Sequence, residues 1–287
     1  MEAQLESLST HTASSSHTII IEPARGWSAL NLRELWEYRD LLYFMVWRDL
    51  KTRYRQTALG PLWILIQPLF SMVLYTIIFG VIAKLPSGGV PYQVFTYCAL
   101  LPWDVFNDAV NSGSTPLLSN RDLISKVYFP RLVLPLTRII SSLVDFSISF
   151  IILIGMLVFY RLSPNWGIVL VPFFLLLAII FGLGTGLWFA GIIVKYRDFG
   201  QISSYLVRFL MYASPVVYSS EIVPKQFYFI YHLNPMANVL EGFRWALLGS
   251  PPPDWRMLGI STLLALVLLV SALYNFKRVE RSIVDIV

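Results

Sequence analysis

Charged residues are scarce in this sequence of 287 residues: they make up 14% of it, whereas 56% of the residues are hydrophobic. Soluble globular domains carry about 25% charged residues. The shortage excludes an ordinary soluble domain and indicates an integral membrane protein. The formal net charge of +5 does not require nucleic acid as a partner, because excess Lys and Arg in membrane proteins gather in cytosolic loops near anionic headgroups.

Cysteine is nearly absent as well, since Cys98 is the only one. One cysteine excludes an intrachain disulfide and a cysteine-based metal cluster, and Cys98 is predicted to be a small apolar packing residue. No Gly-x-x-x-x-Gly-Lys-Ser/Thr sequence occurs, so the chain lacks the loop that cradles ATP phosphates. No cleavable signal peptide is visible either, and the polar residues 1–30 are predicted to form a disordered cytosolic tail.

A dense cluster of cations stands directly before a long uncharged run. The four residues Arg48, Lys51, Arg53 and Arg55 fall within eight positions, and residues 56–83 carry no charge. In a membrane protein such a boundary marks the cytosolic edge of a span. The cluster therefore predicts that the first span starts just after it, on the cytosolic side.

The segment before that span has the pattern of an amphipathic helix. Asn31 and Glu34 have the spacing of a capping box, and apolar or aromatic residues then recur every three or four positions up to Tyr54. Residues 31–56 are therefore predicted to form a helix in the membrane interface, with its aromatic side chains at headgroup depth. The alternative is an ordinary amphipathic helix packed on a soluble core.

Long apolar runs account for most of the remaining chain. A spanning helix needs about 20 apolar residues, and residues 57–276 offer six such segments. Thirteen cations lie near the predicted internal ends of the spans and five lie in external segments. This asymmetry favours a topology in which the N-terminus and the C-terminus are both in the cytosol. The predicted fold is an all-α integral membrane domain with six spans and a cytosolic tail at 277–287. The spans are about 62–83, 92–110, 132–160, 168–194, 201–218 and 258–276.

Several spans carry features that a plain lipid-facing helix does not need. Asp104 and Asp108 are four residues apart, so they either face a bundle interior or aqueous path, or lie in solvent beyond a membrane boundary near Trp103. Asp145 falls inside the third span. The alternating glycines at 182–186 lack the strand–turn–helix context of a nucleotide loop, and they predict close packing of helices.

Between spans five and six, residues 224–248 are too short and too interrupted to cross the membrane. Asn234 can cap a helix with Pro235 at its first position, and Gly249 ends it. Its residues would extend about 21 Å, against a hydrocarbon core of about 30 Å. The segment is therefore predicted to form two short external helices, re-entrant or interfacial. Glu241 and Arg244 have the spacing of a pair on the second helix.

Several motifs occur in a fixed order along the chain. They are Arg48-Asp-Leu-Lys-Thr-Arg-Tyr-Arg-Gln-Thr-Ala-Leu-Gly-Pro-Leu-Trp63 before the first span, Leu101-Pro-Trp103, Asn120-Arg-Asp-Leu-Ile-Ser-Lys-Val-Tyr-Phe-Pro130, Lys195-Tyr-Arg-Asp-Phe199, Ser214-Pro215 and Asn234-Pro-Met-Ala237. With these motifs, residues 35–280 resemble the permeases of type-2 ABC exporters, especially those that export O-antigen, capsule or teichoic-acid polysaccharides.

The resemblance implies a homodimer of six-span subunits in the inner membrane of a bacterium, paired with two copies of an ABC ATPase. ATP and Mg would then bind the ATPase, and this chain would hold no catalytic residue, metal or cofactor. It also implies that the loop between spans two and three touches the ATPase and couples hydrolysis to transport. The coupling residues would be Arg121, Asp122, Leu123, Ile124, Ser125 and Lys126.

The cargo that the resemblance implies is a polysaccharide on a polyprenyl diphosphate lipid. Arg48, Arg53 and Arg55 are candidates to bind the diphosphate as the lipid enters, because guanidinium forks suit phosphate oxygens. The alternative is that these cations contact anionic membrane lipids and set topology. Aromatic rings suited to line a sugar pore are those of Trp63, Tyr75, Phe79, Trp103 and Phe106, although aromatic residues in spans also form lipid belts.

Three other functions fit parts of the sequence. One is a type-2 exporter of a drug or lipid. Another is a membrane enzyme acting on polyprenyl-linked sugar, for which Asp104, Asp108 and Asp145 are the carboxylates nearest the centre of the spans. The last is a scaffold, which polar residues inside the spans disfavour.

Overall fold

The computed structural model describes residues 36–55, 60–114, 130, 132–196 and 198–284. Within these ranges the chain is helical and contains no strand. The predicted tail at 1–30 and the predicted coupling residues 121–126 lie outside them. The helices are α2 (Arg39–Arg55), η3 (Gly60–Leu62), α3 (Trp63–Tyr75), η4 (Thr76–Ile82), α4 (Tyr92–Ser114), α7 (Val133–Phe159), η5 (Trp166–Leu170), α8 (Val171–Lys195), α9 (Phe199–Ala213), η6 (Ser220–Ile222), η7 (Lys225–Phe227), α10 (Tyr228–His232), α11 (Pro235–Leu248) and α12 (Trp255–Val284).

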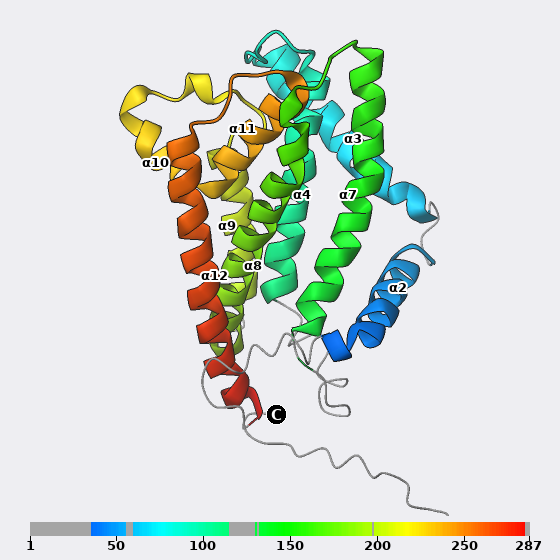
Figure 1. Ribbon diagram of the computed structural model, residues 1–287, viewed down its shortest axis with the longest axis vertical. Coiled ribbons are helices and arrows are strands. Elements are labelled where there is room, and N and C mark those ends of the chain that lie inside the picture. Colours follow the sequence, from blue (N-terminus) through cyan, green and yellow to red (C-terminus); the bar gives the residue numbers. More distant parts are fainter. Residues whose placement is uncertain (1–35, 56–59, 115–129, 131, 197, 285–287) are drawn as a thin grey trace, which may run out of the picture.

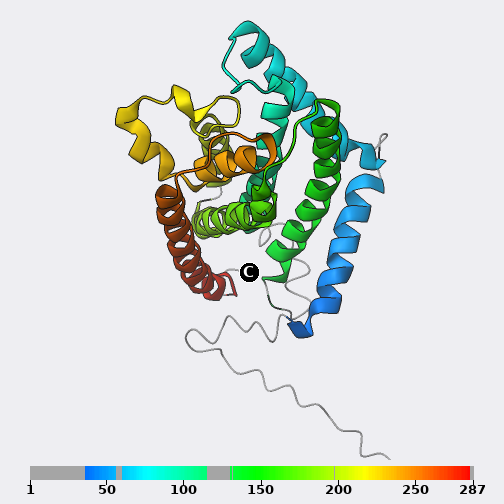
Figure 2. The ribbon, with the colours of Figure 1, turned by 45° about the horizontal axis from the view of Figure 1, so that its top comes forward.

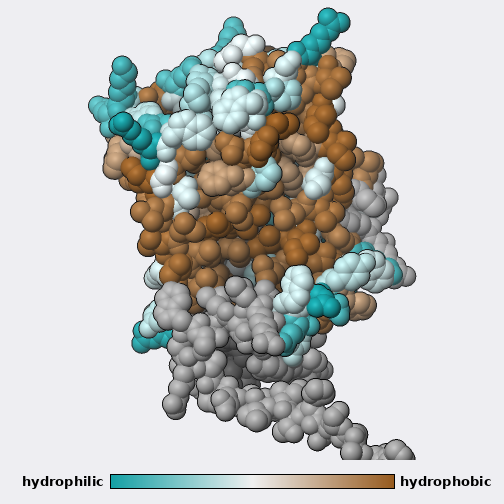
Figure 3. Space-filling view, in the orientation of Figure 1, coloured by the Kyte–Doolittle hydropathy of each residue, from teal (hydrophilic) through white to brown (hydrophobic). Residues whose placement is uncertain are grey.

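Four helices of the described chain are long and apolar enough to cross a membrane: Trp63–Ile82, Val133–Phe159, Trp166–Ile193 and Trp255–Phe276. They coincide with the predicted spans 62–83, 132–160, 168–194 and 258–276, which are thereby confirmed as helices of spanning length. A broad apolar band runs across the middle of the face shown in Figure 3, with more polar residues above it and on the described part of its lower edge. Apolar surface facing outward at this level is what a lipid environment requires.

The other two predicted spans correspond to α4 and α9. Helix α4 has 23 residues, which extend about 34 Å. Its polar side chains make it less apolar than the four helices named above. Helix α9 has 15 residues, or about 22 Å. The count of six spans therefore stays a prediction.

Helix α4 lies at the centre of the bundle, with α8 and α7 against it and α12 on the far side of α8 (Figures 1 and 2). The predicted close packing at 182–186 is confirmed. A Cβ atom on Gly182 would lie 2.6 Å from the Cβ of Ala109 on α4, and one on Gly184 would lie 3.0 Å from the backbone nitrogen of Leu269 on α12. Alternate glycines thus let α8 approach two neighbouring helices at once.

Helix α11 is enclosed at the opposite end of the molecule from α2 (Figure 1). The predicted cap is confirmed, because Oδ1 of Asn234 accepts a hydrogen bond from the backbone N–H of Met236 at 3.0 Å. Gly249 ends the helix with a φ of 70°, a left-handed conformation that favours glycine. Thirteen of the fourteen residues of α11 are buried, so this short helix is part of the protein core.

Arg244 fixes α11 to its surroundings, though not through the predicted pair with Glu241. Its Nη2 donates to the carbonyl of Val216 at 2.8 Å and its Nη1 to that of Tyr218 at 3.2 Å. Its guanidinium also lies over the ring of Phe95, 3.5 Å from the centroid. Glu241 instead lies 3.8 Å from Nδ1 of His232.

Helix α2 packs along the lower half of α7 (Figure 1). Met45 is buried against Val133 and Leu134 of α7. The opposite face of α2 exposes the aromatic rings of Tyr43 and Trp47. An exposed face of aromatics is the surface expected of a helix at headgroup depth, and the interfacial position itself stays a prediction.

Candidate functional site

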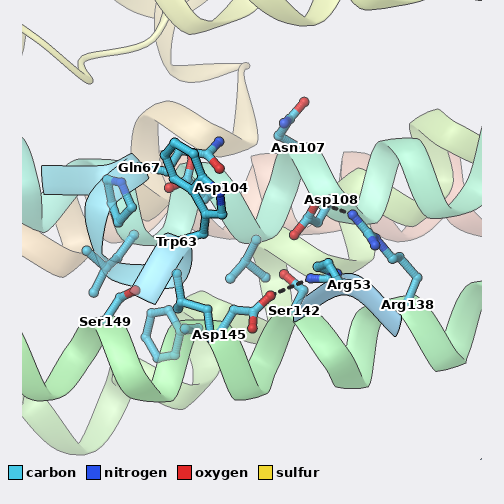
Figure 4. Close-up of a pocket in the computed structure, with 15 residues that line it drawn as sticks. Arg53, Trp63, Gln67, Asp104, Asn107, Asp108, Arg138, Ser142, Asp145 and Ser149 are labelled. Carbon is cyan, nitrogen blue, oxygen red and sulfur yellow. Dashed lines mark hydrogen bonds and ion pairs between the residues drawn. The ribbon is translucent and has the colours of Figure 1, made fainter. Parts of the chain in front are cut away.

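A polar cavity of about 530 Å³ opens between α2, α3, α4 and α7. Its volume falls in the range of about 300–1,000 Å³ that is typical of small-molecule sites. Figure 4 shows the side chains that line it, which come from four separate helices. They are Arg53 from α2, Trp63, Ile64, Gln67 and Pro68 from α3, Leu101, Asp104, Val105, Asn107 and Asp108 from α4, and Arg138, Ser142, Asp145, Phe146 and Ser149 from α7.

Arg53 joins α2 to α7 at the rim of this cavity. Its Nη1 donates to Oδ2 of Asp145 at 2.6 Å, and its Nη2 donates to Oδ2 of Asp49 at 2.6 Å. The side chains of Arg53 and Asp145 are only 24% and 20% exposed. Partly enclosed, charge-assisted bonds of this length are stronger than surface pairs, so Arg53 holds the two helices together.

Arg138 joins α7 to α4 in the same network. Its Nη2 lies 3.6 Å from Oδ1 of Asp108, and its Nη1 lies 3.8 Å from Oδ2 of Asp49. Figure 4 shows Arg53 pointing toward Asp145 and Arg138 pointing toward Asp108. The two arginines and three aspartates therefore connect the cavity-facing ends of α2, α4 and α7.

Asp104 differs from the other carboxylates of the cavity. Its side chain is exposed to the open space, and no cation of the described chain lies within ion-pair distance of it. The amide side chains of Gln67 and Asn107 and the hydroxyls of Ser142 and Ser149 also line the cavity. The part of the cavity lined by Asp104 and these uncharged polar residues thus offers hydrogen-bonding groups and no further ion pair among the described residues.

The structure brings some of the predicted site residues to the cavity and leaves others apart. Trp63 lines it with 45% of its surface exposed. Trp103 and Phe106 are buried in the protein core, where the Phe106 ring stacks on Phe181 of α8. The rings of Tyr75 and Phe79 are partly buried against the same core.

The predicted diphosphate-binding arginines also differ from one another. Arg48 is exposed on α2, whereas Arg53 is held by two carboxylates. The side chain of Arg55 lies outside the described part of the structure.

Sequence reasoning missed the roles of Arg138 and Gln67 in the cavity. Asp49 is four residues before Arg53, and this spacing predicts a local pair that the structure contains. The link from Arg53 to Asp145 spans 92 residues, so spacing alone does not reveal it. The available signal was Asp145 itself, a lone carboxylate within an apolar run, which must find a partner inside the protein.

The cavity does not have the donor set of a metal centre. Within the described residues, no group of three or more His, Cys, Asp and Glu side chains is placed to hold a metal ion. Asp108 and Asp145 are paired with arginines, and these fixed partners favour a binding or positioning role over proton transfer.

A bundle of apolar helices with charged side chains beside an open polar space is a common feature of membrane transport proteins. The ABC-2 type transporter family matches residues 40–248 of the sequence. The chain belongs to this family of transport permeases.

The relatives are exporters of surface polysaccharides. The chain is 31% identical to the O-antigen export system permease protein RfbA of Myxococcus xanthus over 253 residues, which cover 87% of this chain and 96% of that protein. It is 23% identical to the polysialic acid transport protein KpsM of Escherichia coli, over 82% and 92% of the two chains. It is also 23% identical to the capsule polysaccharide export inner-membrane protein CtrC of Neisseria meningitidis, over 83% and 91%.

Proposed function

We propose that this chain is the membrane subunit of an ATP-driven exporter that moves a lipid-linked polysaccharide across the inner membrane of a bacterium. The names of its relatives support the cargo, and the matches extend over nearly their whole lengths. The observation that carries the proposal is the polar cavity enclosed by α2, α3, α4 and α7. Charged side chains inside a membrane domain are costly, and those that face a water-filled cavity commonly mark the path of a transported substrate.

In this proposal, α4 is one of the two remaining spans, and α9 together with the buried chain that follows it up to Tyr218 is the other, because α9 alone is shorter than the hydrocarbon core. Helix α4 lies between α7 and α8, two helices of spanning length (Figure 1). Helix α9 exposes apolar side chains, including Ile202, Leu206 and Phe209. Such a face requires lipid or a second copy of the chain to cover it, which fits a homodimer.

The end of the molecule that carries α2 faces the cytosol, and the end that carries α10 and α11 faces outward. Cations cluster on and around α2, as expected on the cytosolic side. The exposed Arg48 is then the described cation best placed to meet a diphosphate headgroup. Arg53 has a different role, because its guanidinium already binds Asp49 and Asp145.

The ion-pair network can transmit a movement of the coupling loop to the helices that line the cavity. Helix α4 ends at Ser114 and α7 begins at Val133, so both adjoin the loop that couples to a separate ATPase, which binds ATP and Mg. Arg138 ties these two helices together, and Arg53 ties α7 to α2. A displacement of the loop therefore moves α2, α4 and α7 together and changes the opening of the cavity.

The test is export in cells that lack the gene for this chain. Surface polysaccharide is measured by labelling intact cells, and polysaccharide held inside is measured after lysis. The native gene is expected to restore the surface signal, and replacement of Asp122–Lys126 with alanines is expected to leave glycan inside while the ATPase still hydrolyses ATP. Unchanged export by that variant would contradict the coupling role of the loop, and normal surface glycan without the gene would contradict the function.

A further inference from the structure

We infer that the cavity between α2, α3, α4 and α7 binds neutral or amine-bearing sugar units and disfavours acidic sugars and phosphate. This inference rests on the proposed function for the presence of a glycan and adds the chemical class of sugar that the cavity accepts. It concerns the glycan and not the diphosphate of the lipid.

Charge is the first reason. Two arginines and three aspartates line the cavity, which gives a formal charge of −1. Each arginine lies against a carboxylate of the lining: Arg53 against Asp145 and Arg138 against Asp108. Both arginines also reach Asp49, just outside the lining. The charge of each arginine is therefore offset by fixed carboxylates, and an anionic ligand would compete with these carboxylates for the guanidinium groups.

Asp104 is the second reason, because it is an acceptor without a cation of the described chain beside it. As a carboxylate it repels an anion and accepts hydrogen bonds from hydroxyl or ammonium groups. As a protonated acid it is a neutral donor and acceptor, so in neither form does it add positive charge that would favour an anion over a neutral sugar. Asp108, one helical turn further along α4, is also acidic, so this wall of the cavity favours neutral or cationic ligands.

The remaining lining is suited to a sugar ring. The amides of Gln67 and Asn107 each offer both a donor and an acceptor, which complements a hydroxyl group that does the same. The half-exposed indole of Trp63 provides a flat apolar face at the same cavity. A few polar groups around an aromatic surface are the usual composition of a small-molecule site, and here they suit the polar edge and apolar face of a sugar.

The lone native cysteine makes a direct test practical. Cys98 is fully buried, so a cysteine introduced at the cavity supplies the accessible thiol. Asn107→Cys reports on the cavity, and Asn111→Cys is its matched control, because Asn111 is exposed one turn further along α4 and does not line the cavity. Ile64→Cys, on α3, is a second reporter that keeps the Asn107 amide, because Ile64 lines the cavity and is partly exposed.

The full chain and its ATPase are placed in lipid nanodiscs, and the rate of N-ethylmaleimide labelling is measured at constant ionic strength. The added probes are N-acetylglucosamine, glucosamine, N-acetylneuraminic acid and sodium diphosphate at equal concentration. We expect the first two to slow labelling of Asn107→Cys and Ile64→Cys by about threefold, the factor for a probe present at twice its Kd. The acidic sugar and diphosphate should leave both rates unchanged, as should every probe at Asn111→Cys.

Equal protection by the acidic sugar or by diphosphate would overturn the inference, as would no protection by either uncharged or amine-bearing sugar. Slowing of Asn111→Cys to the same degree would also overturn it, because the effect would then be general. Restoration of polysaccharide export by the cysteine variants in cells is measured separately. Variants that restore export but show no sugar protection would refute the sugar site and leave the proposed function intact.

Discussion

The contact between α8 and α4 at Gly186 leads to a prediction in which two alanine substitutions have opposite effects. A Cβ atom added to Gly186 would overlap the backbone carbonyl oxygen of Val110 and lie 3.0 Å from the Cα of Gly113. Both neighbours are backbone atoms of α4, so no side chain can turn aside. Gly186→Ala must therefore push α8 and α4 apart.

The expected magnitude follows from two opposing effects. Overpacking of a tight interior costs about 1–3 kcal/mol, and the clash with backbone favours the upper part of that range. Replacement of glycine by alanine within a helix gains at most about 1 kcal/mol. The net loss in the free energy of unfolding for Gly186→Ala is therefore about 1–2 kcal/mol.

Gly155 of α7 provides the matched control. It also lies inside a long helix, but a Cβ atom there would meet no atom within 4 Å, so only the gain in helix propensity remains. The assay is thermal unfolding of the purified chain in detergent, followed by loss of the monodisperse peak in size-exclusion chromatography. Gly155→Ala should unfold at or above the native temperature and Gly186→Ala several degrees below it. Equal midpoints for the two variants would refute the close packing of α8 on α4.

Two further predictions concern Arg53 and Arg244. In a double-mutant cycle, Arg53→Gln and Asp145→Asn should couple by about 1–2 kcal/mol in thermal unfolding, less than a fully buried pair because both groups are partly exposed; additive effects would show that the pair contributes nothing. Arg244→Lys should cost about 2–4 kcal/mol, because a lysine cannot hold two carbonyls and lie flat on Phe95, and an unchanged midpoint would rule out the role of Arg244 as the anchor of α11.

The local features of the fold could be predicted from the sequence, because each depends on a short pattern. Four spans follow from runs of apolar residues, and the glycines at 182–186 predict the tight contacts of α8. Asn234, Pro235 and Gly249 mark both ends of α11 through the chemistry of caps. Cys98 is buried as predicted.

Contacts between distant segments were beyond the reach of the same reasoning. Spacing places Glu241 near Arg244 on one helix, but it contains no information on the carbonyls of Val216 and Tyr218, which the arginine binds instead. Those carbonyls lie in a non-helical turn after α9, where backbone acceptors need a donor. The guanidinium of Arg244 has several N–H donors, so it can bind both carbonyls at once. A pair with Glu241 alone would leave these two carbonyls without a donor.

The cavity shows the same limit. Asp104 and Asp108 were recognised as unusual residues of a span, and their spacing left open whether they face the protein interior or solvent. Only the crossing of α2 over α7 places Arg53 beside Asp145 and closes one side of the space that both aspartates face. The crossing depends on the packing of Met45 against α7, a tertiary contact that has no periodic signature.

The most direct test of the central claim is reconstitution of transport. The purified chain and its ATPase are placed in proteoliposomes with a polyprenyl-linked glycan on the outer leaflet, so that the ATP-binding side faces the medium. Movement of the glycan to the lumen is measured by its protection from an added glycosidase. The account predicts protection that requires both ATP and this chain. Absence of protection with an ATPase that is active in the same vesicles, or protection without ATP, would contradict it.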